Sequence, residues 1–214
     1  YKALLTDMPV EAAPAVAALL SEMYDHIPAI FGPRSPSEAL AAEWTALRGG
    51  SSRIGMPQGL YRLDQVAPVT GVPGRMRPGV PDDLELVVEW GEGFGRDTGI
   101  PFPPGHDPIL RWIEEGVLYL WEDSGERVSV SVGHGRTQRG VRIGYVYTPP
   151  ERRGHGYASA LVAELSQEVL DSGFDFCVLY TDLTNPTSNA IYQRIGYELI
   201  SELTDVDLTP EGES

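Results

Sequence analysis

The sequence predicts an α/β fold, with a mixed sheet flanked by helices and a small α/β segment at the N-terminus. Short runs of alternating or β-branched residues, typical of strands, recur between longer runs with helical spacing. Three of the strand-like runs, 117–122, 127–132 and 141–147, follow one another without a helix between them, which predicts antiparallel pairing. The 214 residues are 42% hydrophobic, which is enough for a substantial core.

Proline and glycine divide the chain near residues 66–80, where they are too dense for a helix. We place a domain boundary there, with a small α/β segment over residues 1–70 and the main domain over residues 71–214. In the first segment we expect a short strand over 2–6, helices over 11–24 and 37–47, and a strand over 59–66. A segment of this size buries little surface alone, so we expect it to pack on the rest of the chain or on a partner chain.

The main domain has a clear succession of expected elements. The turn Asp123-Ser124-Gly125-Glu126 is a strong hairpin signal between two of its strands. Besides the three strands named above, we expect a strand over 75–77, helices over 82–96 and 107–115, a helix over 157–171, a strand over 176–181, a helix over 186–194 and an extended stretch over 197–208.

Charge and composition exclude several classes of protein. The chain has 31 acidic and 16 basic residues and a net charge of −15, which argues against binding to nucleic acid or to an anionic membrane surface. The single cysteine, Cys177, cannot form an internal disulfide, and no cysteine and histidine spacing predicts a metal site. This cysteine usage makes a reducing, cytoplasmic setting the expectation. The sequence shows neither an apolar run of about 20 residues nor a signal peptide at its start.

Residues 141–161 are the most informative stretch. A predicted strand leads into a turn with Gly154 and Gly156, and the turn opens a helix. Glycines let backbone N–H groups converge on an anion, and a helix N-terminus adds partial positive charge, so a phosphate is the natural ligand. Arg152 and Arg153 would supply countercharge. The alternative is an ordinary strand-to-helix turn, and neither the P-loop nor the G-x-G-x-x-G pattern fits.

Two motifs in this order resemble those of the GNAT N-acyltransferase superfamily. The first is Arg153-x-x-Gly156-x-Ala158 after a strand that ends in Thr148-Pro149-Pro150, which resembles the family's pyrophosphate-binding motif. The second is Asn185-x-x-Ser188-x-x-x-Tyr192-x-x-x-Gly196-Tyr197, and the resemblance covers about residues 72–208. Three positions depart slightly from the family pattern: Ala158 where Gly is also common, Thr148 where Val is usual and Tyr197 where Phe is usual.

The resemblance implies a centrally splayed sheet and an acyl-coenzyme A, most often acetyl-CoA, as co-substrate. Tyr192 resembles the family's general acid toward the departing thiolate; alternatively, it is a half-packed core tyrosine. Asn185 would lie near the pantetheine. The backbone along the pantetheine arm and around the diphosphate would come from Val146, Tyr147, Thr148, Arg153, Gly154, His155, Gly156, Tyr157 and Ala158.

The resemblance also implies direct transfer in a ternary complex, and Cys177, inside an apolar strand, is better explained as a core residue. A protonated amine must lose a proton before it attacks, so a carboxylate or an ordered water must accept it. The sequence leaves that base open. Residues 93–104 form an expected lid or specificity loop, or an ordinary loop. The remaining undecided candidates are Glu89, Glu92, Asp97 and Glu122 as the base, Tyr145 and Tyr147 as water-ordering or packing residues, and His134 and His155.

The leading hypothesis is therefore an N-acetyltransferase that acts on the primary amine of a small molecule or a peptide. The main alternative is a non-catalytic CoA-binding or regulatory module, because a fold does not guarantee its chemistry. The intact Tyr192 favours the enzyme. We expect neither a nucleic-acid nor a membrane partner, and leave open both a homodimer and a structural role for residues 1–70 as the remnant of a duplicated acyltransferase half.

Overall fold

The computed structural model describes residues 1–100 and 105–212, and this part of the chain forms two compact units. The first unit combines Tyr1–Tyr61 with Tyr180–Asn189 and Leu199–Ser214, and the second combines Arg62–Leu179 with Ala190–Glu198. Each unit is therefore discontinuous in sequence. The two compact units therefore differ from a simple division near residue 70, because the C-terminal strand belongs to the same unit as the N-terminal segment.

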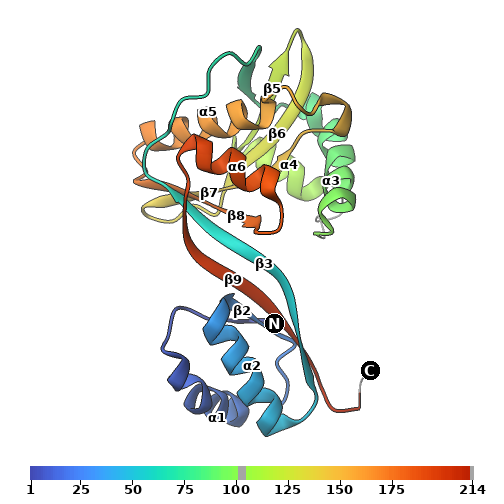
Figure 1. Cartoon of the computed structure of the whole chain (residues 1–214). Helices are drawn as coiled ribbons and strands as arrows, with labels where there is room; N and C mark the ends of the chain where they lie inside the picture. The colour runs from blue at the N-terminus through green and yellow to red at the C-terminus, as the bar shows by residue number, and fades with distance from the viewer. Residues whose placement is uncertain (101–104, 213–214) are drawn as a thin grey trace. The chain divides into compact units, whose positions relative to one another are not determined.

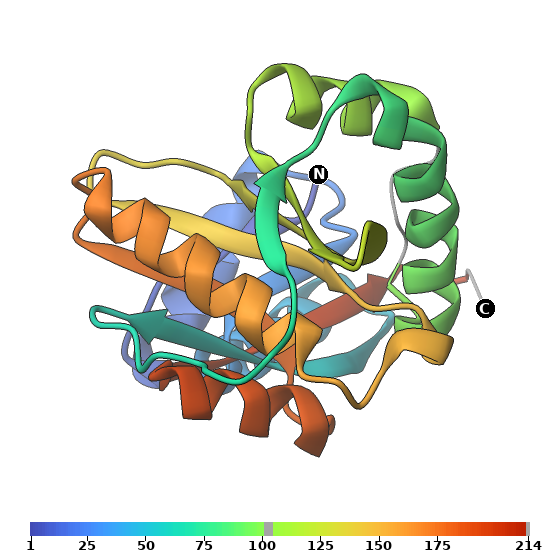
Figure 2. The ribbon, with the colours of Figure 1, turned by 90° about the horizontal axis from the view of Figure 1, so that it is seen from above.

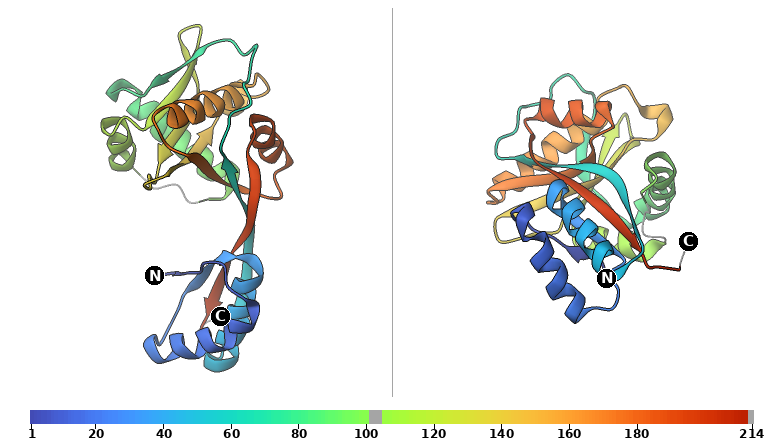
Figure 3. Two further views of the ribbon diagram at one scale, coloured as in Figure 1. Left: turned by 90° about the vertical axis from the view of Figure 1, so that its left-hand side faces the viewer. Right: turned by 60° about the horizontal axis from the view of Figure 1, so that its bottom comes forward.

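The first unit has a sheet in the order β1-β2-β9-β3 with two helices packed on it. Strand β2 pairs antiparallel with β9, where Ile30 lies opposite Val206, and the strands β3 and β9 run side by side (Figures 1 and 3). The N-terminal segment thus packs on the C-terminal strand β9, and packing on the rest of the chain was one of the two outcomes expected for it. The elements of this first unit are β1 (Ala3–Leu4), η1 (Val10–Ala12), α1 (Ala13–Met23), β2 (Ala29–Pro33), α2 (Arg34–Arg48), β3 (Ser51–Leu63) and β9 (Glu198–Thr209), of which β3 ends in the second unit and β9 begins there.

Helices α1 and α2 lie against each other and bury their alanine-rich and leucine-rich faces (Figure 1). Trp44 of α2 is 4% exposed and joins Ile30 of β2 and Val206 of β9 in one hydrophobic cluster. The apolar residues of α2 recur at helical spacing, which explains why the sequence predicted this helix. Strand β2 was not predicted, because its five residues include Gly32 and Pro33.

The second unit has strands in the order β4-β5-β6-β7-β8, in which β4 to β7 pair antiparallel and β7 pairs parallel with β8. This mixed sheet is the predicted one. Its elements are β4 (Arg75–Pro78), η2 (Pro81–Asp83), α3 (Leu84–Thr98), α4 (His106–Glu114), β5 (Leu118–Asp123), β6 (Glu126–His134), β7 (Gly140–Tyr147), η3 (Pro150–Arg152), α5 (Tyr157–Asp171), β8 (Phe176–Asp182) and α6 (Pro186–Ile195), of which β8 ends and α6 begins in the first unit.

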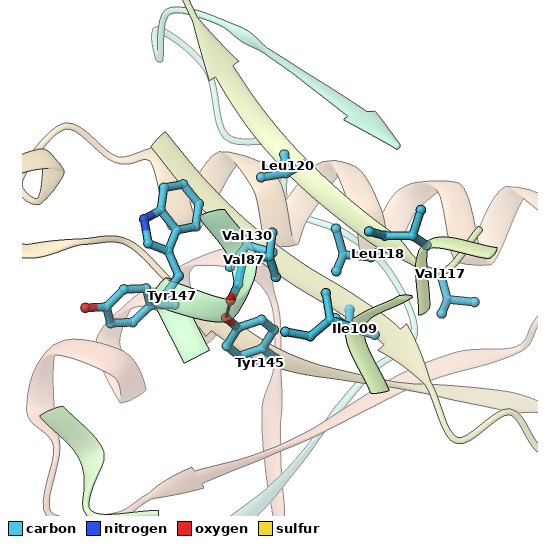
Figure 4. Close-up of a cluster of buried hydrophobic side chains, with 11 residues drawn as sticks. Val87, Ile109, Val117, Leu118, Leu120, Val130, Tyr145 and Tyr147 are labelled. Carbon is cyan, nitrogen blue, oxygen red and sulfur yellow. Dashed lines mark hydrogen bonds between the residues drawn. The ribbon is translucent and has the colours of Figure 1, made fainter. Parts of the chain in front are cut away.

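Two hydrophobic clusters cover the two faces of this sheet. Helix α5 packs on one face, where its Leu161 belongs to the same hydrophobic cluster as Trp121 and Val128. Helices α3 and α4 pack on the other face (Figure 2). Figure 4 shows this second cluster, in which side chains from α3, α4 and strands β5 to β7 meet; the fully buried members are Val87, Ile109, Leu118, Leu120, Val130 and Val132.

Candidate active site

Strand β7 carries a bulge at the point where the site begins. Its pairing with β6 steps from Gly144 to Tyr147 while β6 steps only from Val132 to Val130, so β7 holds one extra residue. Tyr145 absorbs the extra residue with a φ of +48°, a left-handed conformation that is rare for a tyrosine. Such a conformation costs about 1–3 kcal/mol and is found most often at functional sites.

The bulge turns both Tyr145 and Tyr147 toward α3 and α4 (Figure 4). The Tyr145 hydroxyl donates a hydrogen bond of 2.7 Å to the Val87 carbonyl, and burial raises its pKa well above the ordinary value. Phe94 lies edge-on to both rings, with centroids 5.6 Å from Tyr145 and 6.4 Å from Tyr147. Of the two roles left open for these tyrosines, packing therefore describes Tyr145.

A chain of hydroxyls fixes the end of β7. Thr148 Oγ1 donates to Ser129 Oγ at 2.9 Å, and Ser129 Oγ donates to the Tyr147 carbonyl at 2.9 Å. The Tyr147 carbonyl therefore points toward β6. The described parallel pairs between β7 and β8 run from Gly140 and Phe176 to Arg142 and Val178, and the splay of the sheet beyond them stays a prediction.

The loop after β7 ends in a backbone geometry that suits an anion. Gly154 and Gly156 both have a φ of +84°, and Gly156 is the N-cap of α5 without a capping side chain. The first amide bonded within the helix is that of Ala160, which donates to the Gly156 carbonyl at 3.0 Å. The amides of residues 157–159 therefore lack intrahelical acceptors, and the first turn of α5 holds no acidic residue. These features fit the diphosphate of acyl-CoA.

Two side chains brace this loop from within. The Tyr157 hydroxyl donates to Asp123 Oδ2 at 2.7 Å, and this hydrogen bond raises the tyrosine pKa. The His155 ring stacks on Tyr157 with centroids 5.4 Å apart, and its Nδ1 lies 2.9 Å from the Arg153 carbonyl. Both side chains thus hold the loop in shape.

Arg153 has its side chain in an unexpected place. Its Nη2 pairs with Asp97 Oδ2 from the end of α3, and its Nε donates to the Thr148 carbonyl at 2.9 Å. Its Cζ also lies over the Tyr147 ring, 5.7 Å from the centroid. Arg152, the other expected countercharge, lies 3.6 Å from Glu126. In this structure each of the two guanidinium groups therefore has an acidic partner.

Among the four candidate bases, Asp97 is the one that contacts predicted cofactor-binding residues within the described part of the chain. Its carboxylate pairs with Arg153 and lies 3.4 Å from the Tyr147 hydroxyl. Glu122 Oε2 accepts a hydrogen bond from Arg77 at 2.8 Å, which lowers the pKa of its carboxyl and makes it a poor base. Glu92 pairs with Arg96 at 3.8 Å on the surface of α3, and Glu89 is exposed on the same helix.

Tyr192 is buried in α6, with 9% of its surface exposed. Its ring lies edge-on to Tyr197 at 6.0 Å, and the Tyr197 hydroxyl lies within 2.8 Å of Ser166 Oγ. Burial raises the pKa of Tyr192 to about 12, so its phenol stays protonated at neutral pH. The position agrees with either role predicted for it, because a buried phenol can pack and can also donate to an anion.

The other predicted residues have the following positions. Asn185 belongs to the first unit, where its Oδ1 accepts from the Ser188 amide at 3.1 Å and caps α6; its role at the pantetheine stays a prediction. Cys177 is fully buried, and burial raises its pKa to about 11, which confirms a core residue. Burial, with a smaller effect of Arg142, lowers the pKa of His134 to about 4. Residues 101–104 of the expected lid lie outside the described part of the chain.

Two residues of the site were missed by the sequence reasoning. Ser129 holds the end of β7, and the alternation Val128-Ser129-Val130-Ser131-Val132 was its only signal, since it places a serine on a buried face of a strand. Gly93 leaves room for the Tyr147 ring to pack against α3, because a Cβ at this position would lie 2.5 Å from the Tyr147 hydroxyl oxygen. Nothing in the local sequence distinguishes Gly93 from its neighbours Gly91 and Gly95.

Neither a metal cluster nor a membrane helix is found in this part of the chain. Within residues 1–100 and 105–212 there is no group of three or more histidine, cysteine, aspartate or glutamate side chains suited to a metal ion. None of the described helices has the length and apolar character needed to cross a membrane.

Comparison with known proteins identifies the family. The profile of the "Acetyltransferase (GNAT) family" matches residues 87–197, just over half of the chain. A comparison of this chain with curated protein sequences found no match. A GNAT-family acetyltransferase from Colwellia psychrerythraea superposes with a TM-score of 0.68 at 13% identity, covering 94% of this chain and 72% of its own length.

Two GCN5-related N-acetyltransferases superpose similarly. That from Kribbella flavida has a TM-score of 0.65 at 15% identity, covering 97% of this chain and 78% of its own. That from Sphaerobacter thermophilus has a TM-score of 0.65 at 20% identity, covering 86% and 61%. At such identities the structural likeness shows the fold. The family profile, in addition, matches the segment from α3 to Tyr197, which contains the predicted site residues. By profile and fold together, this chain belongs to the GNAT family of acetyltransferases.

Proposed function

We propose that this protein transfers an acyl group, most often acetyl, from acyl-CoA to the primary amine of a small molecule or a peptide. The observation that carries the proposal is the α5 N-terminus, where glycines with positive φ leave the amides of residues 157–159 without intrahelical acceptors. A diphosphate matches this arrangement of amides and the partial positive charge of the helix end. The family membership supports acyl transfer as the chemistry.

The residues that would bind the co-substrate lie along one path of the second unit. The backbone from Val146 to Thr148 would bind the pantetheine and offer an N–H to the thioester carbonyl, and the amides from Arg153 to Ala158 would bind the diphosphate. When bound, acyl-CoA supplies an activated thioester. The Ser129 hydroxyl, which donates to the Tyr147 carbonyl, keeps the strand end rigid, so that these backbone groups are already oriented before binding.

Tyr192 would stabilise the thiolate that leaves. With a pKa of about 12, its phenol is protonated when a thiolate forms beside it. Complete transfer of its proton to a thiolate, whose thiol has a pKa of ~8.5, is uphill by about 3.5 units or ~5 kcal/mol. Tyr192 would therefore donate a strong hydrogen bond, and the proton that finally reaches the sulfur would come from the attacking amine.

Direct attack by the amine is supported by the environment of Cys177, the residue best suited by type to a covalent route. Cys177 is the one cysteine in the sequence, and it is buried with a raised pKa. A covalent acyl-enzyme on this thiol would need a thiolate, which burial disfavours. The amine would thus attack while both substrates are bound.

Replacement of Tyr192 by phenylalanine tests the hypothesis that this tyrosine stabilises the leaving thiolate of an acyltransferase. A charge-assisted hydrogen bond is worth about 1.5–3 kcal/mol, so we expect turnover with acetyl-CoA and an amine panel to fall ~10- to 100-fold. The Kd of acetyl-CoA should change little. Tyr197→Phe, which removes a hydroxyl bonded to Ser166, is the matched control and should retain turnover.

The outcomes separate the two functions. Equal loss of acetyl-CoA affinity in Tyr192→Phe would make this tyrosine a packing residue. Tight binding of acetyl-CoA without thiol release for any amine would favour a non-catalytic CoA-binding module.

A further inference from the structure

Three electron-rich groups of the second unit meet around the Arg153 guanidinium. They are the Asp97 carboxylate at the end of α3, the ring of Tyr147 at the end of β7, and the Thr148 carbonyl. The Tyr147 hydroxyl also lies 3.4 Å from Asp97 Oδ2, so the carboxylate and the ring are in mutual contact. A carboxylate, an aromatic face and a carbonyl oxygen together form a binding site for an organic cation.

The aromatic wall of this site is built into the core. Tyr147 is 7% exposed, and its ring contacts Trp90 and Phe94 at centroid distances of 6.5 and 6.4 Å. The lack of a side chain at Gly93 lets the Tyr147 hydroxyl approach α3. The wall therefore keeps its position whether or not Arg153 lies against it.

Arg153 itself is held weakly. The side chains of Arg153 and Asp97 are 49% and 36% exposed, so solvent screens their ion pair and it contributes little. The contact with the ring and the hydrogen bond to the Thr148 carbonyl are also open to solvent on the guanidinium side. An incoming cation that makes the same contacts can thus replace Arg153 with a loss of only ~5- to 30-fold in its apparent affinity.

We propose that Asp97, Tyr147 and the Thr148 carbonyl bind a guanidinium or ammonium group of the acceptor substrate, and that Arg153 occupies this site until the acceptor displaces it. The proposal rests on the proposed function and names its substrate class, an amine that carries a second, cationic group. The bound cation is separate from the reacting amine, because the reacting amine must be deprotonated and an anionic site holds amines in the protonated form. Thr148 is the last residue of the backbone run assigned to the pantetheine and the thioester, so a cation held at its carbonyl would place the reacting amine of the same acceptor near the thioester.

Agmatine, which carries a guanidinium and a primary amine, is a direct probe for calorimetric binding without acetyl-CoA. We expect Arg153→Ala to bind agmatine ~5- to 30-fold more tightly than the wild type, since the internal competitor is gone. Arg152→Ala is the matched control, because it removes the same charge from the neighbouring residue, which faces Glu126. It should change the affinity less than about twofold. Equal affinities in Arg153→Ala and the wild type, or an equal gain in Arg152→Ala, would overturn the proposal.

Acetylation kinetics provide a second, independent test. Asp97→Asn should raise the KM for agmatine at least ~10-fold and leave that for n-pentylamine, which has no second cation, almost unchanged. Glu92→Gln on the same helix is the control and should alter neither KM. If Asp97→Asn raises both values alike, or neither, the cation site is wrong although acetyl transfer stands. Failure of the wild type to bind acetyl-CoA would instead refute the proposed function, and the agmatine titration would still decide the cation site.

Discussion

Ser129→Ala tests whether the end of β7 is rigid for a functional reason. The Ser129 side chain is fully buried, donates to the Tyr147 carbonyl and accepts from Thr148. Its loss leaves a buried carbonyl without a partner, which costs about 1–3 kcal/mol. Thr148 is only half-buried and can turn its hydroxyl to water, so we expect a loss near 1–2 kcal/mol in urea unfolding.

The same chain supplies the control. Ser131 is also fully buried in β6, and its hydroxyl donates to the Gly144 carbonyl at 3.2 Å, on the far side of the bulge. Ser131→Ala should cost about 1 kcal/mol in stability. Only Ser129→Ala should raise the Kd of acetyl-CoA, by ~5- to 10-fold, since about 1–1.4 kcal/mol of orientation is lost. Equal Kd values for the two variants by calorimetry would refute the idea that this hydroxyl orients the binding strand.

Two further predictions concern stability. His134 has a folded pKa of about 4, below the ordinary 6.5, so the unfolded chain takes up this proton first and stability falls as pH drops from 6.5 to 4. His134→Gln should reduce this acid loss of stability by about 1–2 kcal/mol, measured by urea unfolding at pH 7 and pH 4; a loss equal to that of the wild type would contradict the assignment. Asp83 is 1% exposed and accepts two hydrogen bonds from Arg77, at 2.7 and 2.9 Å, so Asp83→Asn should cost about 2–3 kcal/mol in urea unfolding, against less than about 0.5 for the exposed Asp82→Asn.

The predicted elements were mostly confirmed because their signals are local. Helix α5 begins at Tyr157 and ends at Asp171 as expected, since a glycine turn precedes it and a glycine follows its last apolar residues. The hairpin at Asp123–Glu126 and the antiparallel strands around it also follow from adjacent residues. Strand β3 was predicted too short, because its first half, from Ser51, alternates poorly and lies mostly exposed.

The site was predicted only where a motif spans it. The glycine turn and the end of β7 were found, but the bulge at Tyr145 arises from a mismatch between two strands and has no signature in one of them. The contact of Arg153 with Asp97 joins residues 56 positions apart, so only the folded chain reveals that the expected countercharge faces a carboxylate at the end of α3. The pairing of β2 with β9 is equally nonlocal, and it gave the two compact units their discontinuous course.

Calorimetric titration of the wild type and of Gly156→Val with acetyl-CoA tests directly whether the N-terminus of α5 binds the co-substrate. Gly156 has a φ of +84°, and even a Cβ there would lie 3.0 Å from Val72 Cγ2, so valine must distort the turn that presents the α5 amides. We expect micromolar binding by the wild type and at least ~10-fold weaker binding by a variant whose circular dichroism shows that it is folded. Equal affinities, or no binding by the wild type, would contradict this expectation.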